Sequence, residues 1–230
     1  MSTPTAMTHF SSSHALRYPS WLSWCTAALW LSVPLGVPLG VAHAQPTKAT
    51  APAVAQAAAP AATLLPAQSS LGFAITQMGV PVQGSFRKFD ASVNFDPAQP
   101  ATGRIALVVD VGSATLGSRE ADAEMPKPVW FHAAQFPQAR FQSTAIRALG
   151  GGRFEVVGKL SIKGASREVV APVALTQTGT GAALITVASG TLSIPRLAFK
   201  VGEAEWADTS LVADAVQIRF SLALRGVPNL

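Results

Sequence analysis

Two neighbouring stretches of the sequence decide the fold: Phe136-Pro-Gln-Ala-Arg-Phe-Gln-Ser143 and Val156-Val-Gly-Lys-Leu-Ser-Ile-Lys-Gly-Ala-Ser166. In both, apolar and polar residues alternate with a period of two, which is typical of β-strands with one buried and one solvated face. Gly158 and Gly164 interrupt the second stretch, at places where a barrel strand bends or a hairpin turns. The two stretches therefore predict strands of a sheet that is apolar on one side.

The same alternation continues on both sides of these stretches, and turn residues such as Gly150-Gly-Gly152 separate its segments. It stops between Ser118 and Ala134, where an acidic segment predicts one short helix that Pro126 ends. About eight to ten strands at such spacing favour an all-β antiparallel barrel or sandwich. The expected strands lie at 71–75, 82–86, 93–95, 103–111, 139–149, 153–163, 167–178, 182–194 and 216–224.

The first 44 residues are expected to be a secretory signal peptide. A polar segment with Arg17 precedes an apolar run from Trp21 to Val41, and Ala42-His43-Ala44 supplies the small residues that a signal peptidase recognises. An uncleaved membrane anchor is the alternative, because the apolar run is long enough to span a bilayer. A lipoprotein anchor at Cys25 is disfavoured, since Cys25 opens the apolar run instead of closing it. We expect cleavage after residue 44.

The remaining chain is expected to form a linker and one domain. Residues 45–62 are rich in Ala, Pro, Gln and Thr and cannot bury a core, so they predict an extended or disordered linker. Residues 63–230 are a normal size for one domain. After the leader is removed, 16 basic and 12 acidic residues remain, a net charge of +4. Because the basic residues are scattered singly, no nucleic-acid partner is expected.

Several further elements lie in order along the domain. They are Gly84-Ser-Phe86, Asn94-Phe-Asp-Pro97, Asp110-Val-Gly-Ser113 and Trp130-Phe131. Together with the two opening stretches they resemble the YceI-like family of periplasmic polyisoprenoid-binding proteins, from about Ser69 to Leu224. Two elements depart from the family pattern. Ile194-Pro195-Arg196 stands where the family has Asn-x-Arg, and Arg119–Met125 lacks the His of the family's R-D-x-H-L segment.

The resemblance implies a lipocalin-like, eight-stranded barrel whose elongated apolar cavity holds a polyisoprenoid, an isoprenoid quinone or a related long-chain lipid. It also implies a periplasmic binding protein that is not an enzyme and needs no cofactor besides the bound lipid. Transient membrane contact and a homodimer are left open. The alternative is a solid-cored module that acts through its surface in envelope stress or in a redox complex.

The apolar faces of the strands, with the aromatic segment before Phe136, supply candidates for the cavity lining. The same residues would fill a solid core, because a period of two shows which residues share a face and not which face points inward. The candidates are Phe73, Phe86, Leu107, Val109, Phe131, Phe141, Leu160, Ile162, Ile194, Phe220 and Leu222.

Three polar or amphipathic residues are candidates for the rim of the cavity. Arg196 and Trp206 would hold a ligand head group, or else form an ion pair and a packed aromatic that close the barrel end. His132, the one histidine of the predicted domain, is either a polar group at the rim or a surface histidine. With no second histidine and no cysteine in this domain, no metal site is expected.

Two catalytic interpretations are weaker. A hydrolase would need His132 as the base for Ser143 or Ser161, and no nucleophile-elbow motif surrounds either serine. Glu120, Asp122 and Glu124 could form a carboxylate cluster, but a solvated helix face explains the same spacing.

Overall fold

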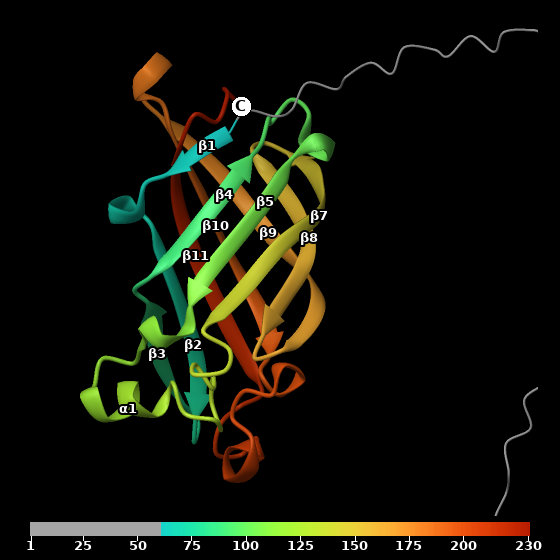
Figure 1. The fold of residues 1–230 in the computed structure, drawn as a ribbon. Coiled ribbons are helices and arrows are strands. Elements are labelled where there is room, and N and C mark those ends of the chain that lie inside the picture. The colour runs from blue at the N-terminus through green and yellow to red at the C-terminus, as the bar shows by residue number, and fades with distance from the viewer. Residues whose placement is uncertain (1–60) are drawn as a thin grey trace, which may run out of the picture. The chain divides into compact units, whose positions relative to one another are not determined.

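The computed structural model describes residues 61–230 (Figure 1). The predicted leader, residues 1–44, lies outside the described residues, and so does the predicted linker apart from its last two residues. The first strand begins at Ala61, two residues inside the predicted linker. No helix among residues 61–230 combines the length and the hydropathy that a membrane span requires.

The described residues form an almost purely β structure. One α-helix, α1 (Arg119–Glu124), is present among them, with its N-cap at Ser118, whose side chain accepts from the Ala121 N–H. Short 3₁₀ turns cover Pro66–Gln68, Pro100–Thr102, Val111–Ser113, Gly181–Ala183, Leu197–Phe199 and Ala204–Ala207. The strands are β1 (Ala61–Leu64), β2 (Ser70–Gln77), β3 (Val80–Phe86), β4 (Phe89–Asn94), β5 (Arg104–Asp110), β6 (Ala114–Thr115), β7 (Gln138–Gly150), β8 (Arg153–Ile162), β9 (Ala165–Thr178), β10 (Ile185–Pro195) and β11 (Ala215–Arg225).

Eight strands close into an antiparallel barrel in the order β1-β4-β5-β7-β8-β9-β10-β11, and β1 pairs back with β11. The remaining strands, β2, β3 and β6, extend the sheet beyond β11 at the α1 end (Figure 1). Closure reduces the length of unpaired strand edge that an open sheet would expose. The prediction of an all-β, eight-stranded barrel with one short helix is confirmed.

The chain between β1 and β2 lets both strands pair with the same edge of β11. Leu64 pairs with Leu224, and Ser70 pairs with Ser221. In the gap between them the Ser69 hydroxyl accepts from the Ala223 N–H at 2.9 Å, and the Leu65 N–H donates to the Ala223 carbonyl at 2.8 Å. These two bonds keep the seam of the barrel paired where the strand is interrupted.

Three phenylalanine rings lie against glycines of neighbouring strands. Phe73 covers Gly84, Phe141 covers Gly158, and Phe220 covers Gly190, so a β-carbon at any of these glycines would collide with the ring. Because a glycine offers no side chain, each ring occupies the space beside its glycine; Phe141 and Phe220 do so on the wall of the barrel, and Phe73 does so on the β2–β3 extension. This arrangement leaves space along the barrel axis that the rings would otherwise fill.

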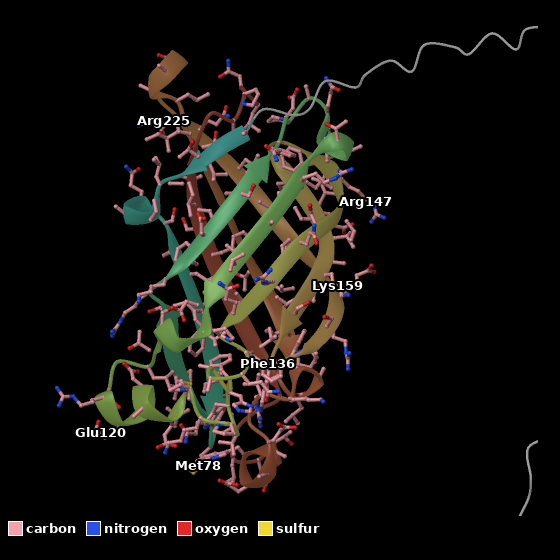
Figure 2. The ribbon with its side chains drawn as sticks, viewed as in Figure 1. Met78, Glu120, Phe136, Arg147, Lys159 and Arg225 are labelled. Atoms are coloured by element: carbon pink, nitrogen blue, oxygen red, sulfur yellow. The ribbon has the colours of Figure 1, made fainter. Side chains whose placement is uncertain are left out.

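A β-bulge in β7 changes which residues face inward. Ser143 pairs with Gly158 and Ala145 with Val157, so Thr144 is an extra residue in β7. The inward face therefore passes from Phe141 to Ile146, whose side chain is buried. Outward-facing side chains such as Arg147 and Lys159 point to solvent (Figure 2).

We expect Gly190→Ala to destabilise the protein. The new methyl group would collide with the Phe220 ring and with the carbonyl of Pro172, and overpacking of this kind costs about 1–3 kcal/mol. Urea denaturation followed by circular dichroism measures the loss. Ser193→Ala, at an exposed position of the same strand, is the control. Equal stabilities of the two variants would contradict the proposed ring–glycine packing.

Candidate functional site

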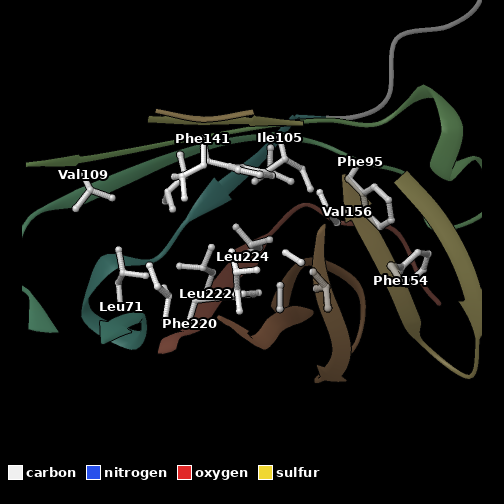
Figure 3. A pocket seen from close by; sticks show the side chains of 18 of the residues that line it. Leu71, Phe95, Ile105, Val109, Phe141, Phe154, Val156, Phe220, Leu222 and Leu224 are labelled. Carbon is white, nitrogen blue, oxygen red and sulfur yellow. The ribbon is translucent and has the colours of Figure 1, made fainter. Parts of the chain in front are cut away.

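The barrel encloses an apolar cavity of about 170 Å³. A cavity needs only about 10–15 Å³ to hold one water molecule, so this cavity has room for a much larger molecule. Side chains from opposite walls face each other across the space: Ile105, Val109 and Phe141 from one wall, and Leu71, Phe220, Leu222 and Leu224 from the other (Figure 3). The interior is therefore hollow, which the alternative of a solid-cored module did not predict.

Most of the predicted lining residues face this cavity. Nine of the eleven candidates line it: Phe86, Leu107, Val109, Phe131, Phe141, Leu160, Ile162, Phe220 and Leu222. The other two, Phe73 and Ile194, line a second, smaller cavity of about 70 Å³ next to it. Period-two alternation grouped the strand residues among them on one face of each strand, and the closed barrel turns that face inward. Phe131 comes instead from the aromatic segment before Phe136.

The structure adds lining residues that the sequence pattern did not single out. Leu71, Ile105, Phe154, Val156 and Ile218 are in phase with named candidates on their strands, so the same alternation could have found them. Ile146 follows the β7 bulge and Val227 follows the end of β11, so alternation gives no signal for either. Phe95 and Phe154 meet edge to face at one end of the cavity, with ring centroids 5.2 Å apart.

Thr186 is the one polar residue among the 26 described residues that line the larger cavity. It is fully buried, and its hydroxyl accepts from the Gln177 side-chain amide at 3.0 Å. The same amide nitrogen donates to the Pro228 carbonyl at 2.7 Å, which fixes its orientation. Among the described residues none accepts from the Thr186 O–H, so this proton can be donated to an oxygen of a ligand.

Arg196 was predicted either to hold a ligand head group at the rim or to help close the barrel end, and its contacts in the structure match a structural role. Its side chain is buried, and an arginine has five N–H donors. All five are used on backbone carbonyls at 2.6–3.0 Å, those of Val201, Gly202, Trp206, Val212 and Ala213. Arg196 therefore holds the loop of residues 196–214 in place and has no donor left for a ligand.

The buried charge of Arg196 is balanced locally. Burial lowers the pKa of its guanidinium from the ordinary value, and the nearby Asp214 carboxylate opposes this change. Asp214 in turn accepts from the Leu197 N–H at 2.9 Å. Because the ordinary pKa of an arginine lies far above neutral pH, the side chain stays charged at neutral pH and keeps every donor.

Trp206 and His132, the other two rim candidates, line neither cavity. Trp206 packs against Trp130, with ring centroids 5.6 Å apart and planes at 40°. His132 has a backbone φ of 50° and lies edge to face with Phe136 at 5.8 Å. Trp206 thus matches the alternative of a packed aromatic that helps to close the barrel end.

Two end loops, residues 116–137 and 196–214, are joined at the α1 end of the barrel. The N–H groups of Gly202 and Glu203 both donate to the Val129 carbonyl, at 2.8 and 3.1 Å. The buried Lys163 side chain, at the β8–β9 turn, donates to the Lys200 carbonyl at 2.6 Å and pairs with Glu203 at 2.8 Å. Backbone and aromatic contacts therefore connect the two loops to each other, and Lys163 connects the loop of residues 196–214 to the barrel.

The serines and acidic residues considered as catalytic candidates either form hydrogen bonds within the fold or are exposed. The Ser143 hydroxyl accepts from the Ile105 N–H at 2.8 Å, and Ser161 bonds Ser166 at 2.7 Å. Glu120 and Glu124 are exposed, whereas Asp122 accepts from the Thr115 hydroxyl and the Leu116 N–H, both at 2.7 Å. No group of three potential metal-ligating side chains comes together within residues 61–230.

The matched family is the YceI-like domain, over residues 63–224. The chain belongs to the YceI-like family. Solved structures agree with this assignment. BcnA of Burkholderia cenocepacia is 42% identical, with a TM-score of 0.65 over 70% of this chain and 98% of that chain. A polyisoprenoid-binding domain from Saccharophagus degradans shares the fold at 15% identity, with a TM-score of 0.58 over 72% of this chain and 98% of its own.

Curated relatives match a shorter region of this YceI-like protein. A UPF0312 protein of Yersinia pestis is 32% identical over 108 residues, which are 46% of this chain and 56% of the relative. A UPF0312 protein of Azotobacter vinelandii is 30% identical over 101 residues, 44% of this chain and 53% of the relative. The chain thus spans about half the length of the curated relatives it matches.

We expect Arg196→Lys to destabilise the α1 end strongly. A lysine has three N–H donors, so at least two of the five carbonyls lose their partner, each at about 1–3 kcal/mol. Urea denaturation should therefore show a loss of about 2–6 kcal/mol. Arg219→Lys on the exposed outer face of β11 is the matched control. A loss no greater than that of the control would show that the five bonds do not hold the end loop.

Asp122 should titrate below the ordinary range of an aspartate. The Thr115 hydroxyl bond, followed by the Leu116 N–H bond, lowers the pKa of its carboxyl. A lowered folded-state pKa means that these bonds add stability above about pH 3.9, and that this stability is lost as the pH falls through the folded-state pKa. The Leu116 amide shift in an NMR titration reports the midpoint. A midpoint at or above the ordinary aspartate value would contradict the two bonds.

Proposed function

We propose that this protein binds a long-chain apolar lipid inside its barrel, namely a polyisoprenoid, an isoprenoid quinone or a related amphiphile. The observation that carries the proposal is the hollow barrel interior. Of its 26 described lining residues, 25 are apolar, and most of them come from the strands of the barrel. Transfer of a hydrocarbon chain from water into such a site is favourable, whereas a polar ligand finds few hydrogen-bonding partners there.

The size of the hydrophobic driving force suits a carrier. Burying roughly 400 Å² of ligand surface gives about 10 kcal/mol of gross stabilisation at about 25 cal/mol per Å². Association and ordering costs reduce this figure by several kcal/mol. The net affinity is then strong enough to keep a lipid out of water and weak enough to release it to a membrane.

The mechanism is binding without chemistry. Ser143 already binds the Ile105 N–H, and Arg196 has no free donor. The proposed carrier works in the periplasm, after export through the N-terminal leader, and contacts a membrane when it loads or releases its lipid. Membership of the YceI-like family and the polyisoprenoid-binding description of the Saccharophagus domain support this choice of ligand class.

Native mass spectrometry of protein purified gently from the periplasm tests the proposal. We expect a stoichiometric apolar adduct, whose mass separates an isoprenoid from an acyl chain. Ala171→Phe, on the cavity wall, should lower the liganded fraction by about tenfold, because the ring occupies space that the chain needs.

Ala174→Phe provides the matched control, because residue 174 is exposed on the same strand. It should leave the adduct unchanged. Wild-type protein that stays ligand-free after incubation with prenyl lipids would contradict the proposal and favour an interaction module. Equal adduct levels in both variants would show that the lipid does not occupy the cavity.

A further inference from the structure

The two cavities of the barrel share part of their lining. Phe86, Phe131, Ile162 and Ile218 line both the larger cavity and the smaller one at the α1 end. The two apolar cavities therefore adjoin at these four side chains, which form the partition between them. We call the larger cavity the main chamber and the smaller one the end chamber.

Of the four partition residues, Phe131 is held most loosely by the backbone. Phe86, Ile162 and Ile218 belong to β3, β8 and β11, where ladder pairing fixes their direction. Phe131 lies instead in the end loop of residues 116–137, where its N–H donates to the Met125 carbonyl at 3.1 Å. Its ring meets Phe86 edge to face, with centroids 5.8 Å apart. A rotation of this one side chain would join the chambers without breaking a strand.

The end chamber suits the end of a hydrocarbon chain and not a polar head group. Its other lining residues are Phe73, Ile75, Met125, Trp130, Ile194, Phe199, Val201 and Val216, together with Arg196. Every donor of Arg196 is already bonded to a carbonyl, so it offers no polar contact to a ligand. Met125 adds a flexible thioether that adapts to irregular apolar shapes.

Thr186, the polar residue of the main chamber, lies toward the end of the barrel opposite the end chamber. Thr186 stands near the start of β10 and lines the main chamber, whereas Ile194 stands near the end of the same strand and lines the end chamber. Eight residues of β-strand separate them, which corresponds to about 26 Å. A ligand that bonds Thr186 through its oxygen would therefore direct its tail toward Phe131.

From this geometry we propose that Phe131 is a partition that sets the length of chain the barrel accepts. Short chains fit in the main chamber with the ring in place. Longer chains displace the ring and put their ends into the end chamber, against Trp130. This inference rests on the proposed function, since it concerns the length preference of the same lipid site.

A series of prenyl alcohols of increasing length, from farnesol through geranylgeraniol to solanesol, tests the partition. Affinities come from competition with an environment-sensitive fluorescent probe. We expect Phe131→Ala to raise the affinity ratio of solanesol to farnesol by about tenfold, a change that corresponds to about 1.4 kcal/mol. Phe136→Ala, which removes a ring of the same end loop that lines neither chamber, should leave the ratio unchanged.

Two further measurements keep the test decisive if Phe131→Ala folds poorly. Val216→Phe fills the end chamber from β11 and should lower the same ratio, because residue 216 lines only that chamber. A geranylgeranyl chain brominated at its far end should quench Trp130, measured as the difference in emission from Trp130→Phe. Farnesol brominated in the same way should quench it less.

The outcomes separate the two proposals. If no prenyl alcohol binds the wild-type protein, the proposed function fails and the partition fails with it. If prenyl alcohols bind and the length ratio is the same in wild type, Phe131→Ala and Val216→Phe, the partition alone is overturned. Equal shifts in Phe131→Ala and Phe136→Ala would also overturn it, because they would reflect a general loosening of the loop.

Discussion

The fold depends on the pairing of β11 along both of its edges. Along one edge β10 pairs with it over its whole length, from the pair of Ile185 with Arg225 to the pair of Pro195 with Ala215. On the other side β1 and β2 share its length, and Ser69 bridges the gap between them. Without this second edge the sheet would remain open and its apolar face would meet water. Closure therefore converts alternating strands into an enclosed apolar space.

Closure alone would allow a filled barrel, and two local features shape the interior and the α1 end of this one. Glycines on β8 and β10 let the large rings of Phe141 and Phe220 lie against the barrel wall. At the α1 end Arg196 gathers five carbonyls of the loop of residues 196–214. The charged side chain of Arg196 thus fixes the backbone of this loop, while apolar side chains line the cavity.

The amino-acid sequence predicts the strands and their faces well, because both follow from a period of two. Alternation by itself puts Leu107, Phe141 and Leu160 on apolar strand faces, and closure of the barrel makes those faces the inside. The β7 bulge at Thr144 shifts the phase within a strand, so alternation does not place Ile146. The role of Arg196 depends on backbone carbonyls that come together only when the loop folds. The amino-acid sequence therefore does not predict these hydrogen bonds.

A crystal structure of the protein with bound geranylgeraniol tests the central claim, that the barrel interior is the lipid site. The account predicts one continuous chain between the wall of Phe141 and the wall of Phe220 and Leu222, with its hydroxyl within hydrogen-bonding distance of Thr186. A chain bound on the outer face, or an interior that stays empty at saturating ligand, would contradict it.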